Sequence, residues 1–546
     1  MPERADLGGE RAAALDVLEQ ERFDLVLVGG GITGAGIARE ATRRGLSVAL
    51  LEANDYAAGT SSRSTKLIHG GLRYLAMGDF RLVRETALER KVIFGQAPHL
   101  AEPRWMLLPT SSWLAQLKYR LGVTVYEKLG AVTSEDVHRN WSGSALEEAE
   151  PVLARERFPY ACAYREYLTD DARLVLANLR AAVARGARAL NYLRVEGVIE
   201  EQGRVAGVTA RCAETGRTLR IRARTVVNAA GPWVEAVRRL GWRDAPDWLH
   251  LSKGVHIQLP RERLPVRNLV MLEAGDGRIL FVLPRGTVTY VGTTDTTYHP
   301  GAEVWPQVTQ ADVDYLLEPL TRFFSIEPVR RDEIVGAWAG LRPLIAQPGK
   351  GPGELSRRDE LFVGPNGMVS IAGGKLTGYR HMALSVLKKL AELWGQRLPE
   401  PSGDPVLPGG DFDVPLEVLA ESLAADHSLV PAAARSLSRL YGSEAREVLA
   451  LGSTPLGKEQ WVFEGEVDWA VRVEGARHLE DVLYRRNRAA LWAPDAAREV
   501  LEPLGRRMGL ILSWDESTVQ DEISAARDRM RSDLDFSGEQ FSSEPV

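Results

Sequence analysis

The chain has 546 residues, more than one ordinary hydrophobic core can organise, which predicts two or three domains. An apolar content of 45% and a charged content of 26% exclude a mainly disordered chain. The net charge of −6 argues against nucleic acid as a partner, because phosphate binding needs a basic surface. Two cysteines, Cys162 and Cys212, are too few for a disulfide framework or a thiolate metal cluster, which favours a reducing compartment. No metal site is expected.

The N-terminal segment 1–20 is polar and lacks the apolar stretch of a secretory signal. No apolar run approaches the ~18 residues that a membrane-spanning helix needs. We therefore expect a cytoplasmic protein, with peripheral attachment to the cytoplasmic face of the cell membrane left open. Residues 113–121 mix aromatic, leucine and basic side chains, which suits an interfacial helix and equally an ordinary amphipathic surface helix.

The first elements along the chain form a βαβ unit. Residues 23–28 are short, branched and apolar, as in a buried parallel strand. A helix is predicted over 33–44, with Gly45 as its C-cap. A second strand over 46–51 ends in Glu52. This order is typical of a nucleotide-binding unit.

The glycine run Gly29-Gly30-Gly31-Ile32-Thr33-Gly34 lies between the first strand and the helix. Gly29 permits a tight turn, Gly31 admits a pyrophosphate, and Gly34 allows close contact between helix and strand. The free N–H groups at the helix N-terminus would then hold the anion. Glu52, about 20 residues on, is placed to bind ribose hydroxyls and disfavours NADP, but does not separate NAD from FAD.

Residues 57–78 are rich in glycine, serine and threonine and precede a predicted helix over 79–96. Within them, Gly59-Thr60-Ser61-Ser62-Arg63-Ser64-Thr65-Lys66-Leu67-Ile68-His69-Gly70-Gly71-Leu72-Arg73-Tyr74 gathers cations, hydroxyls and a histidine. Loops near the carboxyl ends of parallel strands are where ligands bind, so we interpret this segment as a ligand loop and not as a polar surface loop.

The middle of the chain alternates helices with short strands. A helix is predicted over 171–185 and strands over 188–228, after which Asn228-Ala229-Ala230-Gly231-Pro232-Trp233 passes from strand to helix. Small residues there would let the backbone lie close to a cofactor, although an ordinary strand-to-helix turn explains them equally well. Strands are expected over 250–300, best at 280–283 and 288–291, followed by a helix over 310–324.

A second glycine-rich turn, Ala372-Gly373-Gly374-Lys375-Leu376-Thr377, opens a long helix that reaches Trp394. Its N–H groups and Lys375 would face an electron-rich acceptor, which in a flavoprotein is the N1–C2=O edge of the ring. Arg342 and Arg358, taken singly, are more typical of surface charges. Together with Arg73 and Lys375 they could form a clamp for a phosphate or carboxylate.

Residues 398–410 are dense in proline and glycine and predict a linker. The chain beyond the linker is predicted to form a separate helical domain, with helices over 417–425, 431–441, 444–451, 466–474, 479–485, 495–504 and 516–532. The last residues have the composition of a frayed tail.

Several motifs occur in an order that resembles the FAD-dependent glycerol-3-phosphate dehydrogenases, within the wider family of D-amino acid oxidase and glycine oxidase. The resemblance covers about residues 20–530, and its motifs are GGGITGAGIA, TSSRSTKLIHGGLRYL, VNAAGPW, KGVHI, GTTD, GLRP, SRRD and GGKLTGYR.

The resemblance implies an α/β fold in which a Rossmann-type FAD-binding domain is interleaved with an α+β substrate domain on an antiparallel sheet, plus an all-α C-terminal domain. It implies an N-terminal extension at 1–20, a linker at 401–410, a helical domain at 411–532 and a flexible tail at 533–546. The FAD-binding parts are expected at about 21–110, 165–240 and 335–397, and the substrate-binding parts at about 111–164 and 241–334.

The resemblance also implies oxidation of sn-glycerol 3-phosphate to dihydroxyacetone phosphate, with electrons passing from non-covalent FAD to a membrane quinone. A homodimer is left open. The residues expected to bind FAD are Gly29, Gly30, Gly31, Thr33, Gly34, Glu52, Thr60, Ser61, Ser62, Lys66, His69, Ala229, Gly231, Gly374, Lys375, Leu376 and Thr377.

Oxidation of a secondary alcohol needs a base for the hydroxyl proton and cations that fix the phosphate. His69 is the first candidate for the base and His256 the second, since a neutral imidazole suits this role at cellular pH. Arg342 would orient the substrate hydroxyl. The residues that would bind the phosphate and balance the charge of the reduced flavin are Arg73, Tyr74, Arg358 and Lys375.

Two alternatives stay open. An oxidase of the same family would pass the electrons to oxygen, although the extra insertion that such oxidases tend to carry is not seen here. A non-catalytic or tRNA-modifying flavoprotein would use the flavin differently, but the near-neutral charge and the group of His69, Arg342 and Lys375 count against it.

Overall fold

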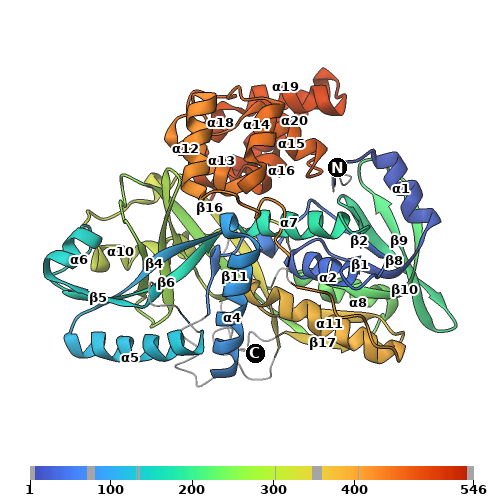
Figure 1. Ribbon diagram of the computed structural model, residues 1–546, viewed down its shortest axis with the longest axis horizontal. Coiled ribbons are helices and arrows are strands. Elements are labelled where there is room, and N and C mark those ends of the chain that lie inside the picture. Colours follow the sequence, from blue (N-terminus) through green and yellow to red (C-terminus); the bar gives the residue numbers. More distant parts are fainter. Residues whose placement is uncertain are drawn as a thin grey trace.

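The computed structural model describes residues 6–70, 80–130, 132, 136–299, 301, 303–346, 359–403 and 405–537. These residues form two mixed β-sheets with helices packed against them, and a group of helices that lies above both sheets in Figure 1. The arrangement confirms the predicted fold class of an α/β domain, a second domain on a largely antiparallel sheet, and a helical C-terminal domain. The domain ranges expected from the sequence remain predictions.

The first sheet, sheet A, has the strand order β17-β18-β10-β1-β2-β7, with β9 and β8 continuing from β10. Its strands are β1 (Arg22–Val28), β2 (Val48–Leu51), β7 (Arg188–Leu190), β8 (Leu193–Glu201), β9 (Arg204–Cys212), β10 (Thr218–Asn228), β17 (Glu360–Val363) and β18 (Val369–Ala372). The strands from β18 to β7 run parallel. Val28 lies opposite both Leu51 and Asn228, so the carboxyl ends of β1, β2 and β10 are level.

Helices α2 (Ile32–Thr42), α7 (Asp171–Val183) and α11 (Tyr379–Trp394) pack against one another and share one hydrophobic core with sheet A. These bounds confirm the predicted helices to within a few residues. Residues 376–378 form the 3-10 turn η6 (Leu376–Gly378), so the last of these helices begins three residues later than predicted. Helix α2 ends at Thr42 with Arg43 as its C-cap, two residues before the predicted cap Gly45, which has φ +79° in the turn that follows.

The segment expected as an extension contains helix α1 (Arg11–Gln20), which packs on β10 and buries Leu15 and Leu18. These two leucines lie about one helical turn apart, and their spacing is the feature of the sequence that indicates this helix. On the same side, α8 (Val234–Gly241) contacts β8 and β18.

The second sheet, sheet B, has the order β15-β11-β14-β13-β12-β4-β6-β3, with β16 beside β11 and β5 beside β6. Its strands are β3 (Leu67–Ile68), β4 (Ala101–Thr110), β5 (Arg139–Ser142), β6 (Tyr160–Thr169), β11 (Leu249–Pro260), β12 (Leu269–Glu273), β13 (Ile279–Arg285), β14 (Val288–Gly292), β15 (Thr296–Thr297) and β16 (Gly336–Ile345). All of its pairs are antiparallel except β4 with β12. The strands predicted at 280–283 and 288–291 are confirmed as parts of β13 and β14.

The helix predicted over 310–324 is wrong in its continuity. The structure has α9 (Gln310–Leu317) and α10 (Leu320–Phe323), separated at Pro319. Proline has no N–H for the helical hydrogen bonds, and its ring crowds the preceding turn. The helix therefore breaks at the proline.

Two further helices, α4 (Phe80–Gln96) and α5 (Trp113–Leu129), contact each other along the lower side of the molecule in Figure 1. A short helix, α6 (Gly143–Ala149), follows β5. The described part of the linker holds no helix or strand, but it is fixed to the first domain. Leu407 N–H donates to the Gln96 carbonyl over 2.8 Å, and Arg39 donates to the Pro405 carbonyl over 3.0 Å.

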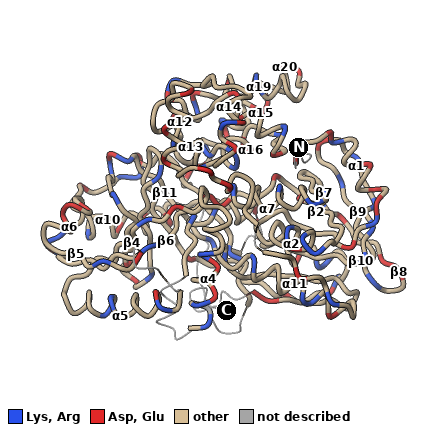
Figure 2. The backbone as a smooth tube through the Cα atoms, in the orientation of Figure 1, with Lys and Arg blue, Asp and Glu red and all other residues tan. Residues whose placement is uncertain are grey.

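The C-terminal domain consists of α12 (Leu416–His427), α13 (Pro431–Tyr441), α14 (Ala445–Leu451), α15 (Glu464–Arg472), α16 (Leu479–Asp481), α17 (Ala489–Trp492), α18 (Pro494–Glu499), α19 (Leu501–Leu512) and α20 (Glu516–Ser532). The segment predicted as one helix over 495–504 belongs to α18 and α19, which adjoin at Val500. The segment over 479–485 continues from α16 into the π-helical turn η8 (Val482–Arg486). Figure 2 shows basic and acidic positions where this domain meets the sheets.

Candidate functional site

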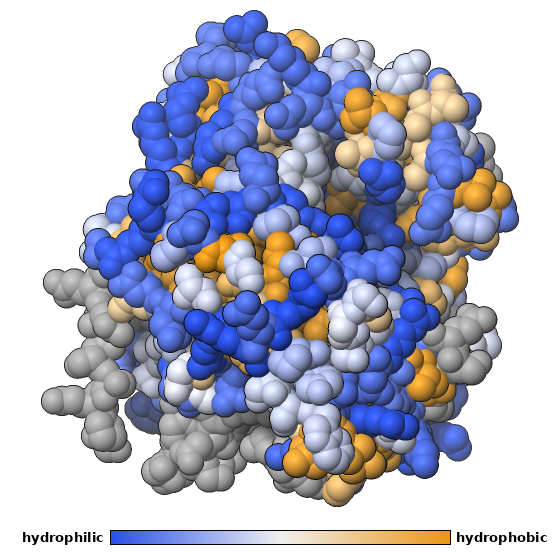
Figure 3. Space-filling view, turned by 90° about the vertical axis from the view of Figure 1, so that its left-hand side faces the viewer, coloured by the Kyte–Doolittle hydropathy of each residue, from blue (hydrophilic) through white to orange (hydrophobic). Residues whose placement is uncertain are grey.

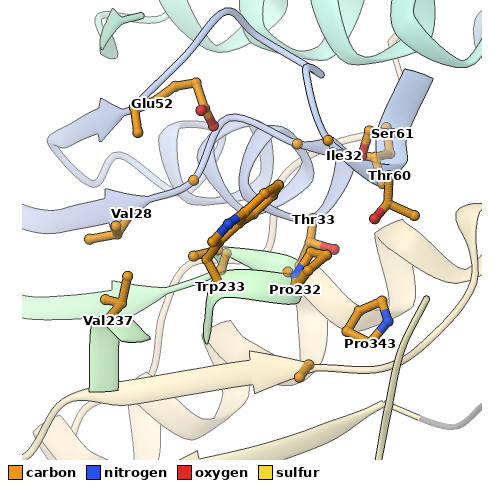
Figure 4. Close-up of a pocket in the computed structure, with 18 of the residues that line it drawn as sticks. Val28, Ile32, Thr33, Glu52, Thr60, Ser61, Pro232, Trp233, Val237 and Pro343 are labelled. Atoms are coloured by element: carbon orange, nitrogen blue, oxygen red, sulfur yellow. Dashed lines mark hydrogen bonds between the residues drawn. The ribbon is translucent and has the colours of Figure 1, made fainter. Parts of the chain in front are cut away.

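A cavity of about 310 Å³ lies at the carboxyl ends of the parallel strands of sheet A. Figure 4 shows its walls. Most of its lining comes from five segments: Val28 to Thr33 without Gly30, Leu51 to Asn54, Ala57 to Ser61, Ala229 to Trp233, and Ile371 to Leu376. The level ends of β1, β2 and β10 therefore create the cavity, at the position where open α/β sheets bind ligands.

The glycine run packs so closely that side chains would not fit. A Cβ on Gly34 would lie 2.0 Å from the Gly29 carbonyl oxygen, and a Cβ on Gly29 would lie 2.6 Å from the Ala229 carbonyl oxygen. Gly29 also has φ +114°, which favours glycine. Helix α2 begins at Ile32, and the Ile32 N–H donates to Ser61 Oγ over 2.9 Å. The first turn of α2 thus faces the cavity with its amide groups.

Glu52 occupies one end of the cavity, at the end of β2, while Thr60 and Ser61 lie toward the other end (Figure 4). Its carboxylate accepts hydrogen bonds from the N–H groups of Gly30 at 2.6 Å and Asn54 at 2.8 Å. Burial raises the pKa of Glu52, and the two backbone donors partly oppose that shift. The acid is held in one orientation, as a group that accepts from ribose hydroxyls requires.

The opposite wall comes from the segments after β10 and β18. The indole of Trp233 extends along the cavity in Figure 4, and a Cβ on Gly59 would lie 2.9 Å from it. Gly373 and Gly374 have φ +81° and +77°, so the turn before η6 depends on glycine. Lys375 lines the cavity directly after this turn.

The structure brings most of the expected cofactor residues to one cavity. Those that line it are Gly29, Gly31, Thr33, Glu52, Thr60, Ser61, Ala229, Gly231, Gly374, Lys375 and Leu376. Two more lie behind the cavity wall: Gly30 donates its N–H to Glu52, and Gly34 allows α2 to pack closely on the Gly29 carbonyl. The other four, Ser62, Lys66, His69 and Thr377, are not among the described residues that line this cavity.

Lys66 lies fully buried behind the cavity wall. Its ammonium donates to the Ser62 carbonyl over 2.9 Å and lies 3.3 Å from Asp171. The pKa of Lys66 is lowered to about 7, chiefly by burial; the charge of Asp171 opposes this shift and that of Arg488 adds to it. In this structure Lys66 therefore contacts the loop that lines the cavity and not the cavity itself.

His69 lies beside the second glycine turn. Thr377 Oγ1 donates to the His69 carbonyl over 3.2 Å, and the half-buried imidazole meets the edge of Phe281. The N–H of Gly70 donates to the Tyr126 hydroxyl over 3.0 Å. The residues around Lys375 and the histidine turn are thus joined, although they are about 300 positions apart in the chain.

Tyr126 belongs to a buried polar group that the sequence did not reveal. Its hydroxyl donates to Glu166 over 3.1 Å and accepts from Arg90 over 3.0 Å. Burial raises the pKa of Glu166, whereas Arg90 and, more weakly, Lys375 lower it. The three side chains lie on α5, β6 and α4, so no local pattern marks them as a group.

His256 and Arg342 come from the adjacent strands β11 and β16 of sheet B. The His256 ring stacks on Trp338 with centroids 4.7 Å apart, and its Nε2 lies 3.0 Å from Thr65 Oγ1. His256 is 2% exposed, and burial lowers its pKa well below the ordinary value. The imidazole is therefore neutral, but little of it is accessible to a substrate.

The Arg342 guanidinium is 20% exposed and is held by hydrogen bonds that fix its plane. It donates to Asp295 over 3.2 Å and to Thr293 Oγ1 over 3.0 Å. Arg73, Tyr74 and Arg358 lie outside the described residues, so their predicted roles stay predictions. Within the described ranges, no group of three or more His, Cys, Asp or Glu residues is arranged to hold a metal ion.

These residues fit a flavin dinucleotide. Gly231 leaves open space beside the cavity, Gly31 lets the backbone line it where a Cβ would lie 3.0 Å from Ser61 Oγ, and the first turn of α2 supplies amide donors for a pyrophosphate. Glu52 stands at the ribose end, and Lys375 stands where a ring that gains negative charge would need a cation.

The sheet and its cavity define an oxidoreductase of the FAD-dependent class, and a family model described as FAD dependent oxidoreductase matches residues 24–380. A second model, described as the C-terminal domain of alpha-glycerophosphate oxidase, matches residues 403–519. The chain belongs to the family of the aerobic glycerol-3-phosphate dehydrogenases. The enzyme of that name from Staphylococcus haemolyticus is 41% identical over 379 residues, which are 69% of this chain and 68% of that protein.

The aerobic glycerol-3-phosphate dehydrogenase of Staphylococcus aureus MRSA252 is 38% identical over 452 residues, which are 80% of this chain and 81% of that protein. Among solved structures, the glycerol-3-phosphate dehydrogenase of Bacillus halodurans in complex with FAD matches with a TM-score of 0.80 and 33% identity, and covers 98% of this chain and 100% of that chain. The family resemblance inferred from the motifs is confirmed, and FAD is the cofactor.

Proposed function

We propose that this protein oxidises sn-glycerol 3-phosphate to dihydroxyacetone phosphate and transfers the electrons to a membrane quinone. The observation that carries the proposal is the hydrogen bond between Thr377 and the His69 carbonyl. It joins a candidate base to the turn that places Lys375 in the cofactor cavity. The names of the relatives point to the same substrate.

Bound FAD supplies the acceptor for the hydride that leaves C2 of the substrate. His69 takes the hydroxyl proton, so the C–H and O–H bonds are lost together and a ketone forms. Arg342, held by Asp295, orients the hydroxyl and stabilises negative charge on that oxygen. Lys375 balances the charge that the cofactor gains. Arg73, Tyr74 and Arg358 bind the phosphate.

His69 is preferred to His256 as the base because its imidazole is half-buried and not enclosed. His256 holds Thr65, at the centre of the loop that leads to His69, and supports the site from behind.

The quinone acceptor requires contact with a membrane, and α5 offers a suitable surface. Trp113, Leu114 and Leu121 are 58%, 60% and 62% exposed, and Leu117 and Val125 continue the same stripe at helical spacing. Phe80 and Leu88 on the neighbouring α4 are exposed as well. Figure 3 shows hydrophobic side chains at the lower end of this face, the end at which α5 lies in Figure 1.

A stripe of this kind, with Lys118 and Arg120 beside it, suits a helix that lies in the interface of a bilayer. Within the described ranges, every helix is too short or too polar to cross a membrane. We therefore assign α5 and α4 as the surface that docks on the lipid headgroups.

The substrate is tested by anaerobic addition of glycerol 3-phosphate to the purified flavoprotein. The flavin absorbance near ~450 nm should bleach with glycerol 3-phosphate and should persist with glycerol, which lacks the phosphate. An unchanged spectrum with excess glycerol 3-phosphate would refute the substrate assignment.

The acceptor is tested separately. A short-chain quinone should support turnover much faster than oxygen does, and little peroxide should appear. Rapid peroxide formation would identify an oxidase instead. Leu117→Asp with Leu121→Asp should abolish flotation with vesicles of mixed neutral and anionic lipid while the flavin is still reduced; equal flotation of both proteins would refute the docking surface.

A further inference from the structure

The loop over residues 55–66 forms part of the cofactor cavity and is held by contacts with other parts of the chain as well as by its own hydrogen bonds. Its segment Ala57 to Ser61 lines the cavity. Ala57 and Lys66, near its two ends, have φ +63° and +58° without being glycine. Such conformations persist only where surrounding contacts enforce them. The question is therefore which groups hold the two ends of this loop.

The first end is held by two arginines of the C-terminal domain. Asp55 is 1% exposed, and Arg486 Nη2 donates to its Oδ1 over 2.8 Å. Arg486 Nη1 and Arg485 Nε both donate to the other carboxylate oxygen. The same carboxylate also accepts from the side-chain amide of Asn191, which follows β7, over 3.0 Å.

The second end is held through Asp171, at the N-terminus of α7. Its Oδ2 accepts from Ser64 Oγ at 2.7 Å and lies 3.3 Å from the Lys66 ammonium. Its Oδ1 lies 3.0 Å from Nη1 of Arg488, which also donates to Asp170 over 2.7 Å. The other nitrogen of Arg488, Nη2, donates to the Ser62 carbonyl over 3.4 Å.

All three arginines come from four consecutive residues, 485–488, which span the end of η8 and the N-cap of α17. Their side chains are 0 to 1% exposed. A buried carboxylate without a partner is costly. Asp55 depends on Arg485 and Arg486 for its charge balance, and Asp171 is balanced jointly by Lys66 of the loop and by Arg488.

We infer that the helical C-terminal domain is part of the cofactor-binding machinery. Arg485, Arg486 and Arg488 are positioning residues that hold the loop 55–66 against FAD. The inference rests on the FAD cavity, which the proposed function shares, and does not depend on which substrate is oxidised.

The chain offers a matched control. Arg180, also on α7, forms two hydrogen bonds of 2.7 Å with Glu444 of the C-terminal domain. This ion pair joins the same two domains and is also largely buried, but it does not contact the loop. Its removal should weaken the domain interface without releasing the loop.

The experiment compares Arg488→Gln with Arg180→Gln in the full-length holoenzyme. The release of FAD is followed by the rise of free flavin fluorescence after dilution, at a temperature at which circular dichroism shows both variants folded. Arg488→Gln should accelerate release by roughly tenfold or more, since hydrogen bonds to charged groups are lost, and Arg180→Gln should change it by less than about threefold. Equal rates in the two variants would overturn the inference.

A milder pair keeps the test decisive if Arg488→Gln does not fold. Arg488→Lys keeps the positive charge but loses the second nitrogen that reaches the Ser62 carbonyl, and Arg180→Lys is the matched change at Glu444. Arg488→Lys should accelerate FAD release several-fold and raise hydrogen exchange over 55–66, whereas Arg180→Lys should do neither. Unchanged release in Arg488→Lys would also overturn the inference.

Failure of the proposed function has a different signature. Wild-type protein that holds FAD but is not bleached by glycerol 3-phosphate would remove the substrate, while the difference between the arginine variants would still stand.

Discussion

The replacement Gly34→Ala tests the geometry of the cofactor cavity most directly. The new Cβ would lie 2.0 Å from the Gly29 carbonyl oxygen, whereas carbon and oxygen normally approach to roughly 3.3 Å. The first turn of α2 must therefore retreat from the end of β1 by more than ~1 Å. The next neighbour, Leu50 Cδ1, would be at 3.6 Å and needs no movement, so the clash is with backbone alone.

A shift of this size changes both stability and binding. Forcing an extra methyl group into a packed site costs about 1–3 kcal/mol. Amide donors that move by ~1 Å leave the 2.7–3.2 Å range of a hydrogen bond, and each bond lost to a charged phosphate is worth about 1.5–3 kcal/mol. The affinity for FAD should therefore fall by at least one to two orders of magnitude.

The assay is the ratio of flavin to protein absorbance after purification, followed by titration of the apoprotein with FAD. Gly95→Ala is the control, because Gly95 lies in α4 with no atom within 4 Å of the new Cβ. That variant should keep its flavin. Retention of normal FAD affinity in Gly34→Ala would refute the assignment of the glycine run to the pyrophosphate.

Three further predictions concern single side chains. His69→Asn should lower kcat by about two orders of magnitude or more with FAD still bound, because general-base catalysis is worth about 10²–10⁴ in rate, and a near-normal kcat would remove His69 as the base. Tyr126→Phe removes the hydroxyl that bonds both the Gly70 N–H and Glu166. The value of kcat should fall roughly tenfold, and the protein should lose about 1–3 kcal/mol of stability. An unchanged kcat in steady-state assays would show that this contact does not position the histidine turn. Lys66→Met removes a buried amine, and burial lowers the pKa of this amine to about 7. The buried ammonium therefore reduces the stability of the wild-type protein at pH 7 and below by up to about 5 kcal/mol, and this cost disappears as the pH rises towards 10. In urea unfolding the wild-type protein should thus become more stable relative to Lys66→Met between pH 7 and pH 10; parallel profiles would contradict the lowered pKa.

The features that the sequence predicted well are local ones. Gly29, Gly31 and Gly34 stand between a strand and a helix within a dozen residues, and Glu52 follows at the next strand end. Parallel pairing places the carboxyl ends of β1, β2 and β10 at one edge of the sheet, and the register of these strands makes the ends level. The second glycine turn before Lys375 was predictable for the same reason.

The parts that were not predictable depend on contacts between distant segments. Lys66 carries the composition of a ligand residue, yet its ammonium is enclosed by Asp171 and the C-terminal domain, which nothing near residue 66 announces. Tyr126 and Glu166 likewise meet only because α5 packs on β6. Pro319 was a local signal, and the break between α9 and α10 could have been predicted from it.

The Asp55–Arg486 pair has a consequence for the order of events during synthesis. Its partners are 431 positions apart, so at ~5–20 residues per second the ribosome needs on the order of 20–90 s between them. For most of that interval sheet A is itself incomplete, because β10 and β18 follow only at residues 218–228 and 369–372, and throughout it Asp55 lacks Arg485 and Arg486. We therefore expect stable insertion of the flavin only in the finished chain, because a chain that ends in the linker has the strands of the cavity but lacks the two arginines that pair with Asp55.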